Sequence, residues 1–177
     1  MKLKLLYIIY LIVGGALYAS PTIKQYSTLE GAFQKVFPNT DFKKIDITLS
    51  KKEKNQIESA LQMALPTQNV ELYRFETMNK PVGFGMVTNH IGKHYPITFF
   101  VATNTNIEIK DVVVLIYRED YGSDVRKRRF LKQFKGKTID DPIQVNYDIT
   151  SISGATLSSY AIANGVREVL TIIEQKI

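Results

Sequence analysis

The sequence predicts an α+β fold, a single domain in which helices flank a twisted antiparallel sheet. Short alternating stretches rich in β-branched and aromatic residues follow one another between residues 70 and 119, which is typical of consecutive antiparallel strands. Helical periodicity precedes these stretches and returns at the C-terminus. The chain has 177 residues, of which 45% are hydrophobic, and this corresponds to about one domain with one real core.

Residues 1–19 have the pattern of a secretory signal peptide. In "MKLKLLYIIYLIVGGALYAS", Lys2 and Lys4 precede an apolar run, and small residues lead to Ala19. An uncleaved membrane anchor is the alternative, although the apolar run is shorter than the ~20 residues of a spanning helix. In either case we expect an exported domain, in the periplasm or at the outer face of the cytoplasmic membrane.

Residues 20–80 are expected to form a helix–strand–helix part of the domain. The stretch "STLEGAFQKVFP" carries Ser27 and Glu30 at the spacing of a capping box, which predicts a short helix. "DFKKIDITL" alternates polar and apolar residues and predicts a strand. Ser50 and Glu53 repeat the capping-box spacing before a second, longer helix.

Residues 81–177 are expected to complete the sheet and to close it with a helix. The stretches "GFGMVTNH", "ITFFVAT" and "IEIKDVVVLIYRE" predict strands, and "NTN" predicts a hairpin turn between the last two. "DVRKRRFLKQFKGK" predicts a short basic helix. Its charges are interpreted as a solvated face, with an acidic redox partner or anionic lipid headgroups as the alternative. "LSSYAIANGVREVLTIIEQ" has apolar residues at the helical period.

The composition excludes several kinds of site. The chain has no cysteine, which excludes disulfides, thiolate zinc sites and iron–sulfur ligation. The two histidines, His90 and His94, lie on an expected strand and turn without an obvious third ligand, so we do not expect a metal site. The formal net charge of +6 is mild, and no nucleic-acid-binding motif accompanies it. Nucleic acid is therefore not an expected partner.

The stretch "DITSISGATLSS" combines hydroxyl residues with a Gly-Ala pair just before the C-terminal helix. Ser153 is the expected N-cap, and Thr156 falls in the first turn. The first amides of a helix lack internal partners and, with the macrodipole, favour an anion. The physics alone predicts a phosphate site with a hydroxyl at its centre, and an ordinary helix cap is the alternative. The residues assigned to this site are Ser153, Gly154, Ala155, Thr156, Ser158 and Ser159.

This stretch resembles the flavinylation motif of the FMN-binding domain family. That family includes the covalent-FMN subunits of sodium-pumping NADH:quinone oxidoreductase and Rnf-type complexes, and single-domain exported members. The residues that carry the resemblance are "SGAT" and, before it, "VGFGMV", "IGKHYPITFFVAT", "VVVLIYREDYG" and "FLKQFKGK". Together they cover the chain from about Pro81 to Val169. One position departs from the family pattern: Thr150 stands where an aspartate is common, and the nearest acid is Asp148.

The resemblance implies a cofactor, a modifying partner and further site residues. FMN is expected to be joined to Thr156 by a phosphoester bond, which a flavin transferase makes from FAD with magnesium. Tyr117, Arg118 and His94 are expected near the flavin. For Arg118 an ordinary ion pair at the end of a strand is the alternative.

Three functions follow as hypotheses. In the first, the protein is an electron carrier rather than a stand-alone enzyme, and relays electrons between a membrane reductase and a membrane or periplasmic redox protein. In the second, it is a flavin-dependent reductase subunit that acts directly on a quinone or ferric acceptor. In the third, it is a binding module without redox function, and "SGAT" is only a helix cap.

Overall fold

The computed structural model describes residues 23–177. The expected signal peptide, residues 1–19, lies outside this range and stays a prediction. Within the described range, no helix combines the length and the apolar character that are needed to cross a membrane.

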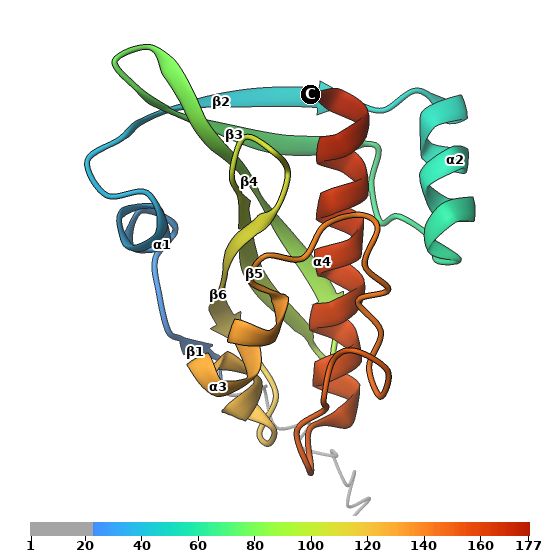
Figure 1. Cartoon of the computed structure of the whole chain (residues 1–177). Coiled ribbons are helices and arrows are strands. Elements are labelled where there is room, and N and C mark those ends of the chain that lie inside the picture. Colours follow the sequence, from blue (N-terminus) through green and yellow to red (C-terminus); the bar gives the residue numbers. More distant parts are fainter. Residues whose placement is uncertain (1–22) are drawn as a thin grey trace, which may run out of the picture.

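A single antiparallel sheet forms the centre of the molecule (Figure 1). Its spatial order is β1-β6-β5-β4-β3-β2, and all neighbouring strands run antiparallel. The strands are β1 (Lys24–Gln25), β2 (Asp41–Thr48), β3 (Asn69–Thr77), β4 (Lys80–Ile91), β5 (Pro96–Thr103) and β6 (Ile109–Tyr117). The α+β prediction is confirmed.

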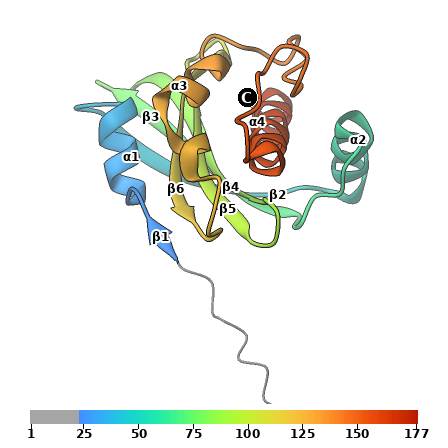
Figure 2. The same ribbon diagram turned by 90° about the horizontal axis from the view of Figure 1, so that it is seen from below.

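Helices cover both faces of this sheet. Figure 2 shows α1 on one side and α4 on the other, with α2 beyond α4. The helices and short helical turns are α1 (Leu29–Val36), α2 (Lys51–Leu61), η1 (Ser123–Arg126), α3 (Arg128–Leu131), η2 (Lys132–Phe134) and α4 (Thr156–Lys176). The long C-terminal helix is thus confirmed and packs mainly against β4 and β5.

Strand β5 contributes to two cores because its side chains alternate between the faces of the sheet. Phe99 and Val101 join the core beneath α4, whereas Phe100 and Ala102 join an aromatic core beneath α1. All four side chains are fully buried. The sheet is therefore covered on both sides at β5, which gives a rigid base to the elements at its ends.

Three details differ from the sequence-based expectations. The N-cap of α1 is Thr28, whose hydroxyl accepts a hydrogen bond from the Gly31 amide, so the capping box expected at Ser27 does not form. The capping box of α2 at Ser50 is confirmed. The expected basic helix is divided into η1, α3 and η2, because the backbone of Lys127 is extended between the first two. Strand β1 was not expected, since two residues are too few to show a period.

Candidate functional site

A cavity of about 560 Å³ lies where three chain segments meet at one end of the sheet. These segments are the start of α4, the loop after β6 and the turn between β4 and β5. The start of α4 is at the lower end of that helix in Figure 1. The lining residues are Lys93, His94, Tyr95, Glu119, Asp120, Tyr121, Gly154, Ala155, Thr156, Leu157 and Ser158.

The Ser-Gly-Ala-Thr stretch forms a β-turn followed directly by a helix. The amide of Ala155 donates to the carbonyl of Ile152 at 2.9 Å, which closes a turn with Ser153 and Gly154 at its centre. Gly154 has φ +77°, as the third residue of a type II turn requires. Helix α4 then begins at Thr156. The turn thus places the threonine in the first helical turn, as the sequence predicts.

The expected N-cap role of Ser153 is wrong. The N-cap is Ala155, which has no side chain that could accept a hydrogen bond from the helix, and Ser153 is exposed at the centre of the turn. Ser159 stabilises the turn instead: its hydroxyl accepts from the Ile152 amide at 3.1 Å and donates to the Ala155 carbonyl at 3.0 Å. Ser159 is fully buried and does not line the cavity.

The start of α4 presents backbone donors without protein acceptors. In the described part of the chain, the amides of Thr156, Leu157 and Ser158 donate to no backbone or side-chain acceptor, and the hydroxyl of Thr156 also has no partner. Unpaired amides at a helix start, together with the macrodipole, favour a bound anion. This helix is 21 residues long, so its dipole is fully developed.

Tyr117, the last residue of β6, fixes the back of the cavity. Its hydroxyl donates to the Tyr121 carbonyl at 2.6 Å and lies 3.0 Å from the hydroxyl of Ser158. Burial raises the pKa of the Tyr117 phenol. Gly122, with φ +82°, passes so close that an added Cβ would lie 2.9 Å from the Tyr117 hydroxyl and from the Ala155 Cβ. Strand β6, the loop after it and α4 are thereby held together.

Glu119 attaches the turn between β4 and β5 to the same wall. Its Oε1 accepts from the amides of His94 at 2.6 Å and Tyr95 at 3.0 Å. Burial on its own would raise the pKa of this carboxyl, but the amide donors of His94, Tyr95 and Lys93 outweigh burial and lower it. A Cβ at Gly92 would lie 2.9 Å from Oε1, so a larger residue there would push the Glu119 carboxylate from its place.

The cavity combines charges of both signs with an apolar mouth. Lys93 contributes a cation, and Glu119 and Asp120 contribute carboxylates. The side chains of Tyr121 and Leu157 are 86% and 52% exposed, respectively. Their unburied apolar area is available to a planar aromatic ligand.

The structure brings together only part of the set of residues assigned from the sequence. Those that line the cavity are His94, Gly154, Ala155, Thr156 and Ser158. Those that lie outside its lining are Ser153, Ser159, Tyr117 and Arg118. The two buried hydroxyl groups among the latter, on Tyr117 and Ser159, act on the cavity indirectly, by holding its walls.

Arg118 turns away from the cavity along the sheet. Its guanidinium donates to the carbonyl of Pro96 at 2.9 Å and to the hydroxyl of Thr98 at 2.8 Å. The alternative of an ion pair also has no support, since no carboxylate lies within salt-bridge distance of Arg118 in residues 23–177. A contact between Arg118 and the flavin stays a prediction.

Sequence reasoning missed several lining residues: Lys93, Tyr95, Glu119, Asp120, Tyr121 and Leu157. The position of these residues in the sequence could have indicated them, because the polar stretches "GKHYP" and "REDYG" directly follow β4 and β6. Strands β4 and β6 run in the same direction because the antiparallel strand β5 lies between them. The turn after β4 and the loop after β6 therefore lie at the same end of the sheet. That topology had to be known first.

The segment that lines the cavity is the part of the chain that matches a known protein family. Residues 92–171 match the family model of the FMN-binding domain. This segment contains every residue that lines the cavity. Among solved structures, the crystal structure of Shewanella oneidensis NqrC is similar to this chain, with a TM-score of 0.55 and 16% identity over 77% of this chain and 81% of that chain. At this identity the similarity shows a shared fold. No curated protein matches the sequence significantly.

Proposed function

Residues 92–171 place this chain in the FMN-binding domain family, and on that premise we propose that it is an exported electron carrier with FMN esterified to Thr156. The observation that carries the proposal is the position of one hydroxyl. Thr156 is exposed, has no protein partner in the described residues, and lies on the wall of the cavity at the start of α4.

The residues of the cavity fit a phosphate ester at Thr156. The free amides of Thr156, Leu157 and Ser158 surround the point of attachment. One remaining phosphate charge at this helix start is stabilised by about 0.3–1 kcal/mol. Lys93, which also lines the cavity, adds an exposed cation.

The cavity also fits the size and the apolar surface of a flavin ring. Its volume of about 560 Å³ lies within the about 300–1,000 Å³ typical of cofactor sites. Tyr121 and Leu157 line the cavity with exposed apolar surface, and the half-buried Tyr95 also lines it. When bound, FMN would supply the redox chemistry, while the protein binds and orients the ring and limits the access of water.

Attachment requires that a modifying enzyme reaches the hydroxyl. We expect the Thr156 Oγ to attack the flavin-side phosphorus of FAD in the active site of a flavin transferase. The P–O–P anhydride breaks, AMP leaves, and the hydroxyl proton passes to a base of the transferase, so no redox change occurs. The exposure of Thr156 supports this approach, and the neighbouring Gly154 has open space around its Cα.

The proposed place of action is outside the cytoplasm, on the strength of the signal-like residues 1–19. There a free flavin would diffuse away, and a covalent bond keeps it on its carrier. Membrane or periplasmic redox proteins are the proposed partners.

The test is the absorbance and the mass of protein coexpressed with a flavin transferase. Wild type is expected to be yellow after denaturation and desalting, and Thr156→Ala to be colourless. Thr105→Ala, at an exposed threonine in the turn between β5 and β6 and outside the motif, is the matched control and should stay yellow. Colourless wild-type protein would instead support the helix-cap hypothesis. Saturable reduction of a small quinone or ferric complex by the isolated reduced protein would support the reductase hypothesis.

A further inference from the structure

The positive charge of the described chain is concentrated in one hollow of about 180 Å³ beside β6. The basic residues that line it, which we call the basic face, are Lys35, Lys110, Arg126, Arg128, Lys132 and Lys135. Asp111 is the acidic residue among its lining. The hollow therefore carries a local net charge of +5, whereas residues 23–177 as a whole carry +4, which is the chain's +6 without Lys2 and Lys4. Outside this hollow the charges almost cancel.

Most cations of the basic face have no acidic partner. Of the six basic residues of the basic face, Lys35 alone forms an ion pair within residues 23–177, with Asp111 at 3.6 Å. Residues 1–22 contain no aspartate or glutamate that could neutralise the others. Burial and the neighbouring charge of Lys135 lower the pKa of Lys110. Unneutralised like charges repel one another and oppose the compact state.

Packing against aromatic rings holds two of these cations in place. The ammonium of Lys110 lies 4.2 Å from the centroid of the Phe37 ring, and the guanidinium of Arg126 lies 4.2 Å from that of Tyr26. Cation–π contacts of this kind are worth about 0.5–1 kcal/mol at exposed sites. The charges are thus positioned on the surface without being neutralised.

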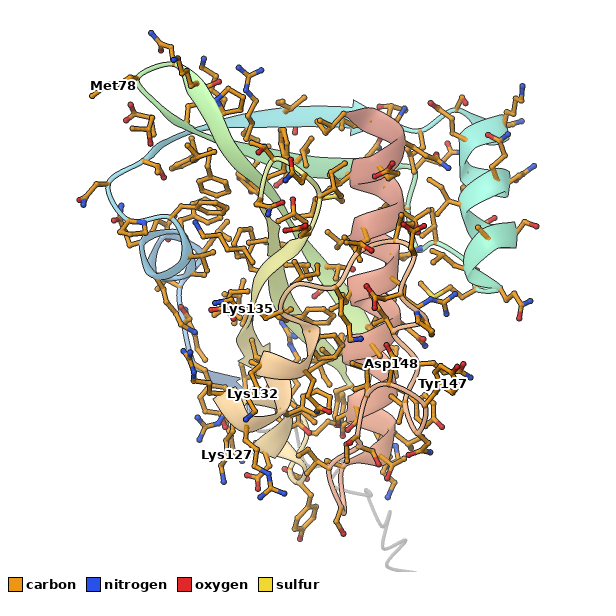
Figure 3. All side chains as sticks on the ribbon, viewed as in Figure 1. Met78, Lys127, Lys132, Lys135, Tyr147 and Asp148 are labelled. Carbon is orange, nitrogen blue, oxygen red and sulfur yellow. The ribbon has the colours of Figure 1, made fainter. Side chains whose placement is uncertain are left out.

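One end of the basic face, at Arg126, lies near the cavity that holds Thr156, whereas its other end, at Lys110 and Lys135, lies at the start of β6. Asp120 and Tyr121 line the cavity, and Gly122, the next residue, packs directly against Ala155. Turn η1 then leads to Arg126. At about 2 Å per residue along such a turn, Arg126 lies roughly 8 Å along the chain from Gly122. Figure 3 shows Lys127, Lys132 and Lys135 on one side of the molecule, with Tyr147 and Asp148 on the other side of α4.

We propose that the basic face is the docking surface for an acidic electron-transfer protein, which it holds beside the flavin cavity. This proposal rests on the proposed function. Complementary charge steers the encounter of two proteins and accelerates association about 10- to 1,000-fold. Tyr121 and Leu157, which line the cavity, supply exposed apolar surface. A polar, charged rim around a smaller apolar contact is the usual anatomy of a transient interface.

An anionic membrane fits this surface less well. Peripheral membrane binding combines positive charge with apolar side chains that insert below the headgroups. The apolar residues of the hollow, Val112 and Leu131, are buried, with 0% and 6% exposure. The surface therefore offers charge without an apolar anchor at its centre.

The experiment measures electron transfer and binding with two protein probes of opposite charge. Plastocyanin, an acidic blue-copper protein, and cytochrome c, a basic haem protein, are mixed with reduced holoprotein in a stopped-flow spectrometer at low ionic strength. The test variant is Lys132→Glu with Lys135→Glu. The control is Lys51→Glu with Lys52→Glu, two exposed lysines of α2, which change the net charge equally on another part of the molecule.

The proposal predicts that the test variant reduces plastocyanin at least about tenfold more slowly than wild type, and that the control variant stays near wild type. Added salt should slow wild type and remove most of this difference. Reduction of cytochrome c should not depend on the basic face in this way. Equal rates of plastocyanin reduction by test and control variants would overturn the proposal.

Two further measurements separate this proposal from the proposed function. Benzoquinone, a neutral acceptor, should oxidise all reduced variants equally, which reports an intact flavin. Titration of flavin-free Thr156→Ala protein with plastocyanin tests docking even if Thr156 carries no flavin, and the Lys132→Glu, Lys135→Glu change should weaken that binding too. A third outcome would refute the proposal. If wild type binds phosphatidylglycerol vesicles, the Lys132→Glu, Lys135→Glu variant does not, and both bind plastocyanin equally, the basic face binds lipid rather than a protein.

Discussion

Helix α4 meets the sheet through two polar regions that differ in one respect. In its middle, Glu168 is buried and bonded to His90 at 2.5 Å, with the hydroxyl of Thr88 3.4 Å away. Gly165 lets the helix approach there, because a Cβ would lie 2.6 Å from the His90 ring. At its start, by contrast, the amides and the hydroxyl of Thr156 face a cavity and find no protein partner in residues 23–177.

The difference shows which polar groups serve the fold and which are available to a ligand. Buried polar groups are almost always paired, so the closed cluster at Glu168 needs nothing from outside the protein. The open groups at the start of α4 satisfy their hydrogen-bonding capacity only with water or a ligand. Variants in the two regions should therefore differ in what they disturb.

The largest loss of stability is expected from the closed cluster. Glu168→Ala removes the partner of His90 and Thr88 and leaves buried polar groups unpaired, which should lower the free energy of unfolding by about 1–3 kcal/mol. Urea denaturation measures this loss. Flavin loading of the folded fraction should stay at the wild-type level. Glu174→Ala, an exposed residue of the same helix, is the control and should change the stability little. A Glu168→Ala protein as stable as this control would mean that the closed cluster contributes nothing.

A smaller loss of stability is expected at Tyr117, which connects the end of β6 to the loop after it and to the start of α4. Tyr117→Phe removes the hydroxyl that bonds the Tyr121 carbonyl and contacts Ser158. The free energy of unfolding should fall by about 1 kcal/mol, and flavin loading by a limiting amount of transferase should slow, because the loop wall loosens. Tyr147→Phe, at a 78% exposed tyrosine, is the control. Loading at the wild-type rate in the Tyr117→Phe protein would show that the wall does not depend on this hydroxyl.

The turn before α4 should show a purely conformational cost. Gly154 has φ +77° with open space around its Cα, and Gly136 has φ +80° with equally open space. Alanine at either position should lower the stability by about 1 kcal/mol, since each needs a left-handed backbone. Thermal denaturation of the two variants provides the comparison. A much larger loss for Gly154→Ala would indicate a contact that the turn geometry does not include.

The smallest effect concerns the pH dependence of the cavity wall. The pKa of Glu119 is lowered in the folded protein below its ordinary value of 4.5, so its ionised form stabilises the fold. That contribution is present above its ordinary value and is lost as the pH falls through the folded-state pKa. The difference in stability between wild type and Glu119→Gln should therefore shrink as the pH is lowered below about 4.5. A difference that grows on acidification would contradict the assigned direction.

The sequence predicted the elements with strong periodicity and the motif with a distinctive composition. Strands β2 to β6, the capping box of α2 and the start of α4 near Thr156 follow from local patterns that the structure retains. The family resemblance directed attention to the "SGAT" stretch, of which Gly154, Ala155 and Thr156 line the cavity, and residues 92–171 match the FMN-binding domain.

What could not be predicted depends on contacts between distant segments. Glu119 and the amide of His94 are 25 residues apart, and only the path of β5 brings them together. Ser153 was assigned the cap because its side chain suits one, but the Gly154 turn moves the helix start beyond it. Glu168 was hidden among apolar helix positions, since its partner His90 comes from another strand.

The most direct measurement is tandem mass spectrometry of the tryptic peptide from residues 138–167, taken from protein that was coexpressed with a flavin transferase. The peptide holds several hydroxyl residues, among them Thr150, Ser153, Thr156 and Ser158. The account predicts the mass of FMN less water on fragments that contain Thr156 and on none that lack it. An unmodified peptide, or an adduct on another hydroxyl, would contradict it.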